Sequence, residues 1–419
     1  MRHQKSARYL FAAGILASAV SIALVPDVAL AQAMDPAILK RIEMLEAEIK
    51  ALKAKPAPAI AKQADGKPLA LSATDGITIF GRVDLGVESN NDGRVNRTVI
   101  QSQKSYIGFR AQRSFSPDLA GIVQIDTTVA PDDNANSTSF ANRNSFVGLR
   151  SKSWGTILAG RHDEPIKLLQ GSAAPVWASA DVMETIINGK TMLATIDGQA
   201  NALTGPAKTA FQSNSANKWG QFHNRLKNVV MYQSPKFGDF NAVVEYSTDE
   251  VNGASGTYKK PTYGGLIQYD DKRWNFGIAA EKLEHFSAKG KDLAALKLTG
   301  GYRGSGWSVG AAYSQIDNNA GRKTNNWMIA GTYKLGPTTL KANYGVGGES
   351  SSGAQDGTKM LGLEVNYPLD DNTSVYTYLA LMDNDKNAYG RFETGTNLYN
   401  TPGAGLNPRA FGLGMRYQF

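Results

Sequence analysis

The 419-residue sequence contains no cysteine, which excludes disulfide frameworks, thiolate metal sites and cysteine nucleophiles. Histidine is nearly as scarce, with four residues, and no serine–histidine–acid arrangement suggests a hydrolase. No spacing matches a calcium, zinc or phosphate-binding motif, so we expect no metal and no cofactor. Beyond residue 33, no apolar run reaches the roughly 20 residues that a spanning helix needs. These absences argue against an enzyme and against a helical membrane protein.

Glycine, by contrast, is abundant, with 43 residues, and the mean hydropathy is −0.31. Glycine costs a helix interior about 1 kcal/mol relative to alanine, so this composition favours strands and turns. The negative mean hydropathy does not exclude a membrane barrel, because only alternate strand residues there face lipid. The net charge of +8 would suit nucleic-acid binding, but the export signal and strand pattern described below argue against nucleic acid as a partner.

The N-terminus has the pattern of a signal peptide over residues 1–33. Arg2, Lys5 and Arg8 form a basic region, which is followed by an apolar stretch. Two possible cleavage sites with small residues come next, Ala29-Leu30-Ala31 and Ala31-Gln32-Ala33. The alternative is an uncleaved anchor, which Pro26 and Asp27 disfavour because they interrupt the apolar stretch. Cleavage would lower the net charge from +8 to +6, because it removes three basic residues and Asp27.

A short helix is expected at residues 34–55. Asp35 can cap it, and Pro36 suits the first helical position. Apolar residues recur at spacings of 4, 3, 4 and 3, the coiled-coil pattern, at Ile38, Ile42, Leu45, Ile49 and Leu52. We expect a periplasmic oligomerisation coil; the alternative is a single amphipathic helix. Residues 56–75, rich in alanine, proline and lysine, are expected to be a linker.

From residue 76 onward the hydrophobic period changes to two. In the first stretch one face holds Ile77, Ile79, Val83, Leu85 and Val87, and the other holds Thr78, Arg82, Asp84 and Glu88. The alternation recurs to the end of the chain, with charged and amide residues on the polar face and aromatic residues near the strand ends of the apolar face. A soluble sandwich also alternates, but an apolar outside, a polar inside and aromatic girdles are typical of a transmembrane β-barrel.

Runs of this kind predict about sixteen antiparallel strands in an all-β barrel over residues 76–419. We expect them at 77–88, 100–113, 119–130, 143–151, 154–161, 223–235, 237–248, 259–270, 273–285, 291–303, 306–317, 322–335, 337–347, 357–368, 372–384 and 408–419. Short turns alternate with longer polar loops between them, which is another barrel feature. Between Arg161 and His223 the alternation stops, and a segment this long suggests a functional loop folded into the lumen; the alternative is an external loop.

Five stretches resemble the trimeric porins of Gram-negative bacteria. They are IFGRVDLGV in the first expected strand, SYIGFRAQ in the second, NSFVGLRSKSWGTILAGRHDEP before the long segment, NRLKNVVMYQSPKFGDFNAVVEY after it, and the terminal Phe419. The resemblance covers residues 76–419 and implies a sixteen-stranded trimeric barrel whose third loop narrows the pore. It also implies that the barrel-assembly machinery reads the terminal strand ending in Phe419.

In that family a basic cluster on the barrel wall faces acidic residues of the third loop. The resemblance assigns the cluster to Arg82, Arg143 and Arg225. Tyr106 stands where the family has a further arginine, and two residues of the same inward parity could compensate, Lys104 and Arg110. The acidic candidates are Asp181 and Glu184 in the loop and Asp163 and Glu164 at its base. The alternative for each is a solvated wall residue paired with a neighbour of opposite charge.

The sequence therefore predicts an outer-membrane porin of a Gram-negative bacterium, for passive diffusion of small hydrophilic solutes and ions, with a mild anion preference. Two alternatives stay open. One is a substrate-selective channel for anionic nutrients such as phosphate or dicarboxylates, and the other is a structural protein that tethers the envelope through residues 34–75. The expected partners are outer-membrane lipid and lipopolysaccharide, further copies of the chain, the assembly machinery and the solutes.

Overall fold

A computed structural model describes residues 76–132, 139–176, 178–189, 222–248, 259–288, 290–317, 319, 321–392 and 403–419. The chain divides into two compact units, Met1–Ala70 and Leu71–Phe419, and all described residues belong to the second. The expected signal peptide, the linker and the coil with Ile38, Ile42, Leu45, Ile49 and Leu52 lie outside the described residues.

One antiparallel sheet contains all seventeen strand segments of the described residues. They are β1 (Gly76–Asn91), β2 (Asn96–Ser102), β3 (Tyr106–Ser114), β4 (Leu119–Thr128), β5 (Ser145–Ser151), β6 (Gly155–Asp163), β7 (Arg225–Gln233), β8 (Phe240–Ser247), β9 (Thr262–Asp270), β10 (Trp274–Ala288), β11 (Lys291–Arg303), β12 (Trp307–Asp317), β13 (Lys323–Leu335), β14 (Thr338–Gly347), β15 (Thr358–Pro368), β16 (Thr373–Asn384) and β17 (Arg409–Gln418).

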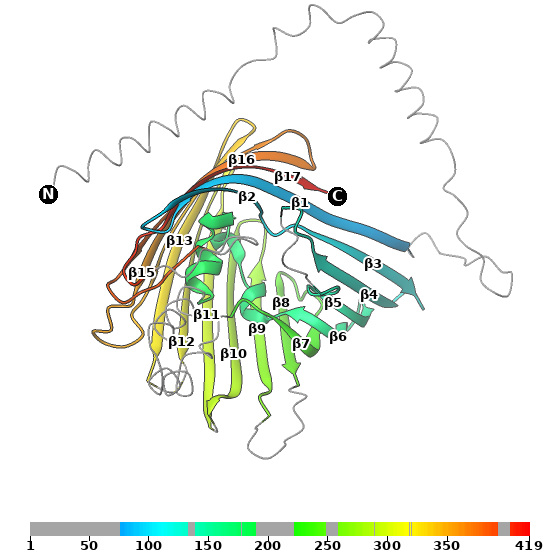
Figure 1. Cartoon of the computed structure of the whole chain (residues 1–419). Coiled ribbons are helices and arrows are strands. Elements are labelled where there is room, and N and C mark those ends of the chain that lie inside the picture. The colour runs from blue at the N-terminus through cyan, green and yellow to red at the C-terminus, as the bar shows by residue number, and fades with distance from the viewer. Residues whose placement is uncertain are drawn as a thin grey trace, which may run out of the picture. The chain divides into compact units, whose positions relative to one another are not determined.

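The sheet closes on itself because β1 pairs with β17 (Figure 1). Strands β2 and β3 are two halves of one barrel strand, since β2 pairs with Leu85–Asn91 and β3 with Gly76–Arg82 of the same β1. The barrel is therefore sixteen-stranded, as predicted. At the seam, Gly81 and Phe419 exchange backbone hydrogen bonds of 2.8 and 3.1 Å. Closure matters in lipid, where an open edge would leave backbone groups without partners.

Turns at one end of the barrel are short, for example residues 152–154, 304–306 and 336–337, and this is called the short-turn end below. The connections at the opposite end include the longest segments. The break between β2 and β3 was not predicted. The alternation changes phase across it, since Ile100 of β2 lies opposite the outward-facing Val87, whereas Tyr106 of β3, six positions on, lies opposite the inward-facing Arg82. Lys104 in this break has a φ of 65°, which interrupts the extended backbone.

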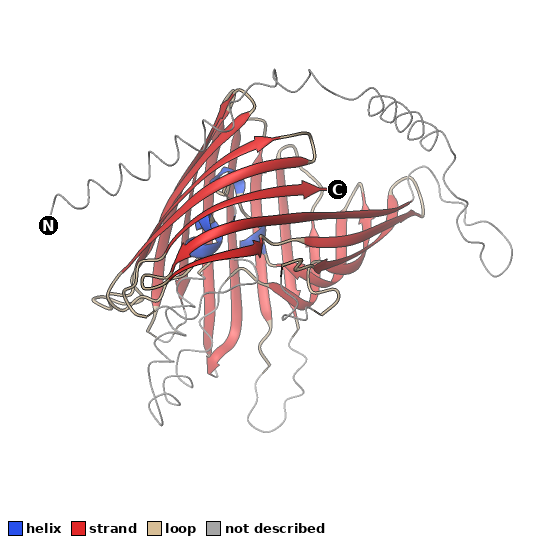
Figure 2. Ribbon diagram, turned by 45° about the horizontal axis from the view of Figure 1, so that its top comes forward, coloured by secondary structure: helices blue, strands red, loops and turns tan. Residues whose placement is uncertain are grey.

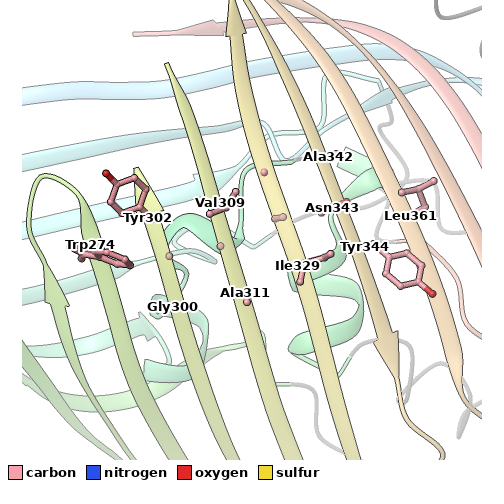
Figure 3. A pocket seen from close by; sticks show the side chains of 14 residues that line it. Trp274, Gly300, Tyr302, Val309, Ala311, Ile329, Ala342, Asn343, Tyr344 and Leu361 are labelled. Carbon is pink, nitrogen blue, oxygen red and sulfur yellow. The ribbon is translucent and has the colours of Figure 1, made fainter. Parts of the chain in front are cut away.

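Apolar side chains cover the outside of the barrel. Ile77 is 74% exposed, Ile329 is 56% exposed and Tyr333 is 56% exposed, as expected for side chains that face lipid. Figure 3 shows a shallow part of this face over β10–β15, where Trp274 and Tyr302 stand on one side and Tyr344 and Leu361 on the other. Small residues separate them, so the aromatic side chains form the rim of an apolar depression on the lipid-facing wall.

The third loop, between β6 and β7, folds into the barrel, as predicted. Its described residues form α3 (Pro165–Leu168), η1 (Gly171–Ala173), η2 (Ala178–Ala180) and η3 (Met183–Ile187), which lie within the ring of strands in Figure 2. In order along the wall, α3 contacts β8–β11, η1 contacts β10–β13, η3 contacts β12–β14 and η2 contacts β15 and β16. None of the helices in the described ranges is long and apolar enough to cross a membrane.

The loop is held by apolar contacts on a wall that would otherwise face water. Val182, Met183 and Ile186 are buried against methionine and tyrosine side chains of β13–β16, namely Met328, Met360, Met382, Tyr376 and Tyr378. Ile166 and Leu169 are buried in a second cluster with residues of β6–β12. Burial of each such loop side chain contributes about 1.5–3 kcal/mol. The inner face of β8–β16 is therefore partly a protein core, and β1–β7 provide the charged wall opposite it.

Glycine permits the close approach of the loop to this wall. A Cβ at Gly362 of β15 would lie 2.1 Å from the carbonyl oxygen of Ala180, and one at Gly310 of β12 would lie 2.5 Å from the carbonyl carbon of Ser172. Both contacts are with backbone atoms, which cannot rotate away. Part of the glycine content thus serves the inner surface on which the loop lies.

Candidate functional site

Two predicted basic residues meet at one aromatic ring on the inner wall. The guanidinium carbon of Arg143 lies 4.4 Å from the centre of the Tyr106 ring, and that of Arg82 lies 5.6 Å from it. Arg143 Nε donates to Asp126 Oδ2 at 3.2 Å, and Arg82 Nη2 donates to the Lys104 carbonyl at 3.0 Å. Tyr106 therefore separates two like charges and offers each a ring face. Arg143 itself precedes β5 rather than lying in it.

Arg110 lies nearer the short-turn end of the same wall. Its Nε donates to Gln124 Oε1 at 3.1 Å, and its guanidinium carbon lies 4.8 Å from the centre of the Phe80 ring. It is exposed to the lumen. The predicted basic residues Arg82, Arg110 and Arg143 thus lie on one side of the pore, along β1–β5.

At the base of the third loop, Asp163 forms ion pairs with two basic side chains. Its Oδ1 lies 2.6 Å from Lys167 Nζ and 3.1 Å from Arg225 Nε, and its Oδ2 accepts from Asn144 at 2.9 Å. Burial lowers the pKa of Lys167 from 10.5 to about 8, although Asp163 opposes this shift. Asp163 and Arg225, predicted for opposite sides of the constriction, are therefore direct partners here.

The two loop carboxylates are themselves neutralised in part. Lys104 Nζ forms an ion pair with Glu184 and lies 3.8 Å from Asp181 Oδ2. His223 Nε2 lies 2.9 Å from Glu184 Oε1, and the Glu184 amide donates to Asp181 Oδ1 at 3.0 Å. Lys104 was predicted as an inward-facing wall residue that could replace the missing arginine at Tyr106, and the structure brings it into contact with the loop.

Glu164 is separate from the arginine cluster. Its Oε1 accepts from the Asn224 amide at 2.6 Å, and it is fully buried beside Glu281, whose Oε1 accepts from the Ile166 amide at 2.5 Å. Burial and the nearby Glu281 raise the pKa of Glu164 well above its usual range. Its described contacts tie the two ends of the loop together, which is an anchoring position rather than one facing the arginines.

Several polar anchors of the loop and the seam were not predicted. Lys297 is fully buried and donates to the Ile166 carbonyl at 3.0 Å and to Asn188 Oδ1 at 3.1 Å. Glu88 accepts from Ser179 of the loop and from Tyr378. Lys297 shares its face with the apolar Leu293 and Ala295 but also with Thr299 and Arg303, so the alternation alone did not mark it as buried. No group of three acidic, cysteine or histidine side chains in the described ranges is placed to hold a metal ion.

A closed barrel with an apolar outside, a charged lumen and an inward third loop is the architecture of a membrane diffusion channel. The model of the Gram-negative porin family matches residues 19–387, and the chain belongs to this family.

Curated relatives of the chain include neisserial outer-membrane proteins. The major outer membrane protein P.IB of Neisseria gonorrhoeae is 25% identical over 308 residues, which are 67% of this chain and 79% of that protein. The protein of the same name from Neisseria lactamica is 23% identical over 315 residues, which are 69% and 82% of the two chains.

Among solved structures, the anion-selective porin from Comamonas acidovorans is similar with a TM-score of 0.67 and 19% identity, covering 82% of this chain and all of that one. This likeness concerns the fold. Together with the family, it makes the chain a non-enzymatic outer-membrane channel, surrounded by lipid, for passive diffusion of small solutes.

Proposed function

We propose that this porin favours anions mildly, and that its constriction lies between the arginines of β1–β5 and the third loop. The observation that carries the proposal is the pair Arg82 and Arg143 at Tyr106, with Arg110 next to them along the wall. On the other side, Lys104 offsets part of the charge of the loop carboxylates, and His223 Nε2 contacts Glu184. On this proposal the arginine side of the lumen makes the pore net positive near the loop, and low-dielectric walls focus such a field.

In this proposal Arg82, Arg110, Arg143 and Arg225 form the basic side, and Lys104 links it to the loop. Asp181 and Glu184 form the acidic side, Asp163 orients Arg225, and Glu164 anchors the loop. The similar fold of a porin from Comamonas acidovorans whose title calls it anion-selective supports the direction of the preference. Salt screens the field over about 8 Å at physiological strength, so the preference is mild.

The proposed assembly is a homotrimer in the outer membrane. It is supported by β5 and β8, which hold 7 and 8 residues, fewer than the about 9–11 that a lipid-facing strand needs. The outer side chain of Val147 on β5 is 63% exposed in the single chain, and in the proposed trimer a neighbouring copy takes the place of lipid at this short strand. Cleavage of residues 1–33, a coil at 34–55, a linker at 56–75, lipopolysaccharide contacts and recognition of Phe419 by the assembly machinery are parts of the same proposal.

Solute flux tests the proposed function. Liposomes that contain the purified protein should swell in neutral sugars at rates that fall with sugar size, and anionic solutes should enter faster than cations of equal size. Single-channel records should show three equal closing steps per insertion. Absence of conductance would favour the envelope-tethering alternative, and a single step would contradict the trimer.

A further inference from the structure

We propose that the lumen holds a binding pocket for small organic carboxylates on the short-turn side of the third loop, centred on Arg110 and Arg150. The proposal deepens the proposed function, because it assumes that anions enter the pore, and it names the class of solute that the wall would retain.

The pocket lies between the inner face of β3–β7 and Leu168 of the third loop. It has a volume of about 360 Å³, within the range of about 300–1,000 Å³ that is common for small-molecule sites. Its polar lining includes Arg110, Arg150, His162, Gln112, Gln124 and Gln233.

The charge of the pocket is positive and lacks an internal counter-charge. None of its lining residues is acidic. The luminal arginines Arg143, Arg225 and Arg416 each have a carboxylate oxygen within 3.2 Å, whereas Arg110 and Arg150 have no carboxylate partner in the described ranges. Their guanidinium groups bond neutral amides instead, Gln124 at 3.1 Å and Gln112 at 3.4 Å. An anion from solution is thus the missing partner.

The geometry suits an anion with two charged ends. Arg150 bonds Gln112, which lies two residues from Arg110 along β3, so that the two guanidinium groups occupy neighbouring levels of one wall. Each presents a planar fork that matches a carboxylate or a phosphate. Phe146, Leu158 and Leu168 add apolar surface to the same pocket, which favours a short carbon chain between the charges over a bare inorganic ion.

The predicted binding is weak and reversible. Both arginines are exposed to the lumen, where water and salt reduce their attraction for an anion. Weak binding is what a channel requires, because a solute must leave as readily as it enters. The pocket would therefore raise the local concentration of dicarboxylates at one mouth of the constriction without closing the channel.

Solute-induced current fluctuations test the pocket. Channels in about 0.1 M KCl are exposed to succinate, to its neutral analogue succinamide and to inorganic phosphate. Succinate should reduce the wild-type current saturably, phosphate should act more weakly, and succinamide should not act. The double variant Arg110→Gln, Arg150→Gln should raise the half-blocking succinate concentration at least about tenfold, since two charge-assisted contacts are lost. Arg113→Gln, on the outer face of β3, removes one positive charge outside the lumen and should leave the block unchanged.

The two proposals fail in different ways. The pocket is refuted, while the anion preference stands, if wild-type channels prefer anions but succinate does not block them saturably. The same conclusion follows if succinate blocks the double variant as strongly as it blocks the wild type. Equal block by phosphate and succinate would contradict the role of the apolar lining. Conductance of the double variant shows that it has folded, so a lost block cannot be attributed to a missing channel.

Discussion

The guanidinium carbon of Arg143 lies 4.4 Å from the centre of the Tyr106 ring, which Arg82 reaches from a different strand at 5.6 Å. A tyrosine at this position therefore organises two arginines, where the family resemblance implied a third arginine. Each cation–π contact is worth about 0.5–2 kcal/mol, depending on its solvation. The ring keeps two like charges apart and fixes both on the wall that faces the loop.

Replacement of Tyr106 by leucine should lower the free energy of unfolding in detergent by roughly 1–2 kcal/mol, because two cation–π contacts are lost. Tyr106→Phe keeps the ring and should remain within about 0.5 kcal/mol of the wild type. Urea titrations of the folded barrel measure both variants. Equal destabilisation by leucine and phenylalanine would show that the hydroxyl, not the ring, is what matters.

Lys104 should hold the loop in place through its ion pair with Glu184. Lys104→Gln leaves two buried loop carboxylates with less compensation, so the loop should move more and single-channel closures should become several-fold more frequent. Lys341→Gln is the matched control, since Lys341 pairs with Glu364 at 2.7 Å on strands β14 and β15 of the wall. Equal gating in the two variants would contradict the anchoring role of Lys104.

The lowered pKa of Lys167 leads us to expect that ion preference and stability depend on pH. Its pKa is lowered to about 8 by burial, while Asp163 and Glu184 favour its charged form and Arg225 opposes it. The pore should lose one positive charge, and hence some anion preference, as the pH rises through about 8. Between pH 8 and 10.5 the unfolded chain binds more protons at this residue than the folded chain does, so its contribution makes stability rise with pH there. In Lys167→Gln channels the pH dependence of ion preference and that of stability should both be smaller. The difference in ion preference between wild type and variant, plotted against pH, should have its midpoint near pH 8.

Gly362 should tolerate no side chain, because a Cβ would meet the Ala180 carbonyl oxygen at 2.1 Å. Gly362→Ala should cost about 1–3 kcal/mol and displace the loop, with a changed conductance. Gly300→Ala is the control, because its Cβ would lie 3.4 Å from the nearest atom, an ordinary contact. Unfolding titrations and single-channel conductance measure both, and an unchanged Gly362→Ala channel would contradict the close loop packing.

Most of the barrel was predictable, because a lipid face and a water face impose strict alternation. The strand expected at 291–303 is found with the same bounds. The strand expected at 100–113 runs across the break at Lys104, where the outward-facing positions change from even numbers in β2 to odd numbers in β3, so one continuous alternation does not describe it. The inward fold of the third loop followed from the resemblance and from the length of the segment.

The partners of the charged residues could not be predicted, since they depend on which strand faces which part of the loop. Sequence parity assigned Lys104 to the lumen but could not bring it to Glu184, eighty positions away. Lys297 appeared to belong to a solvated polar face, and only the loop that covers β11 makes it a buried donor. Glu164 and Asp163 are neighbours in sequence, yet one anchors the loop and the other pairs with Arg225.

The most direct test of the account is the zero-current potential of wild-type channels in a tenfold KCl gradient, repeated with Arg82→Gln, Arg143→Gln. Wild-type channels should give a potential of the sign set by chloride preference, and the double variant should bring this potential toward zero or reverse it. A wild-type potential of the sign given by potassium preference, or one that the double variant leaves unchanged, would contradict it.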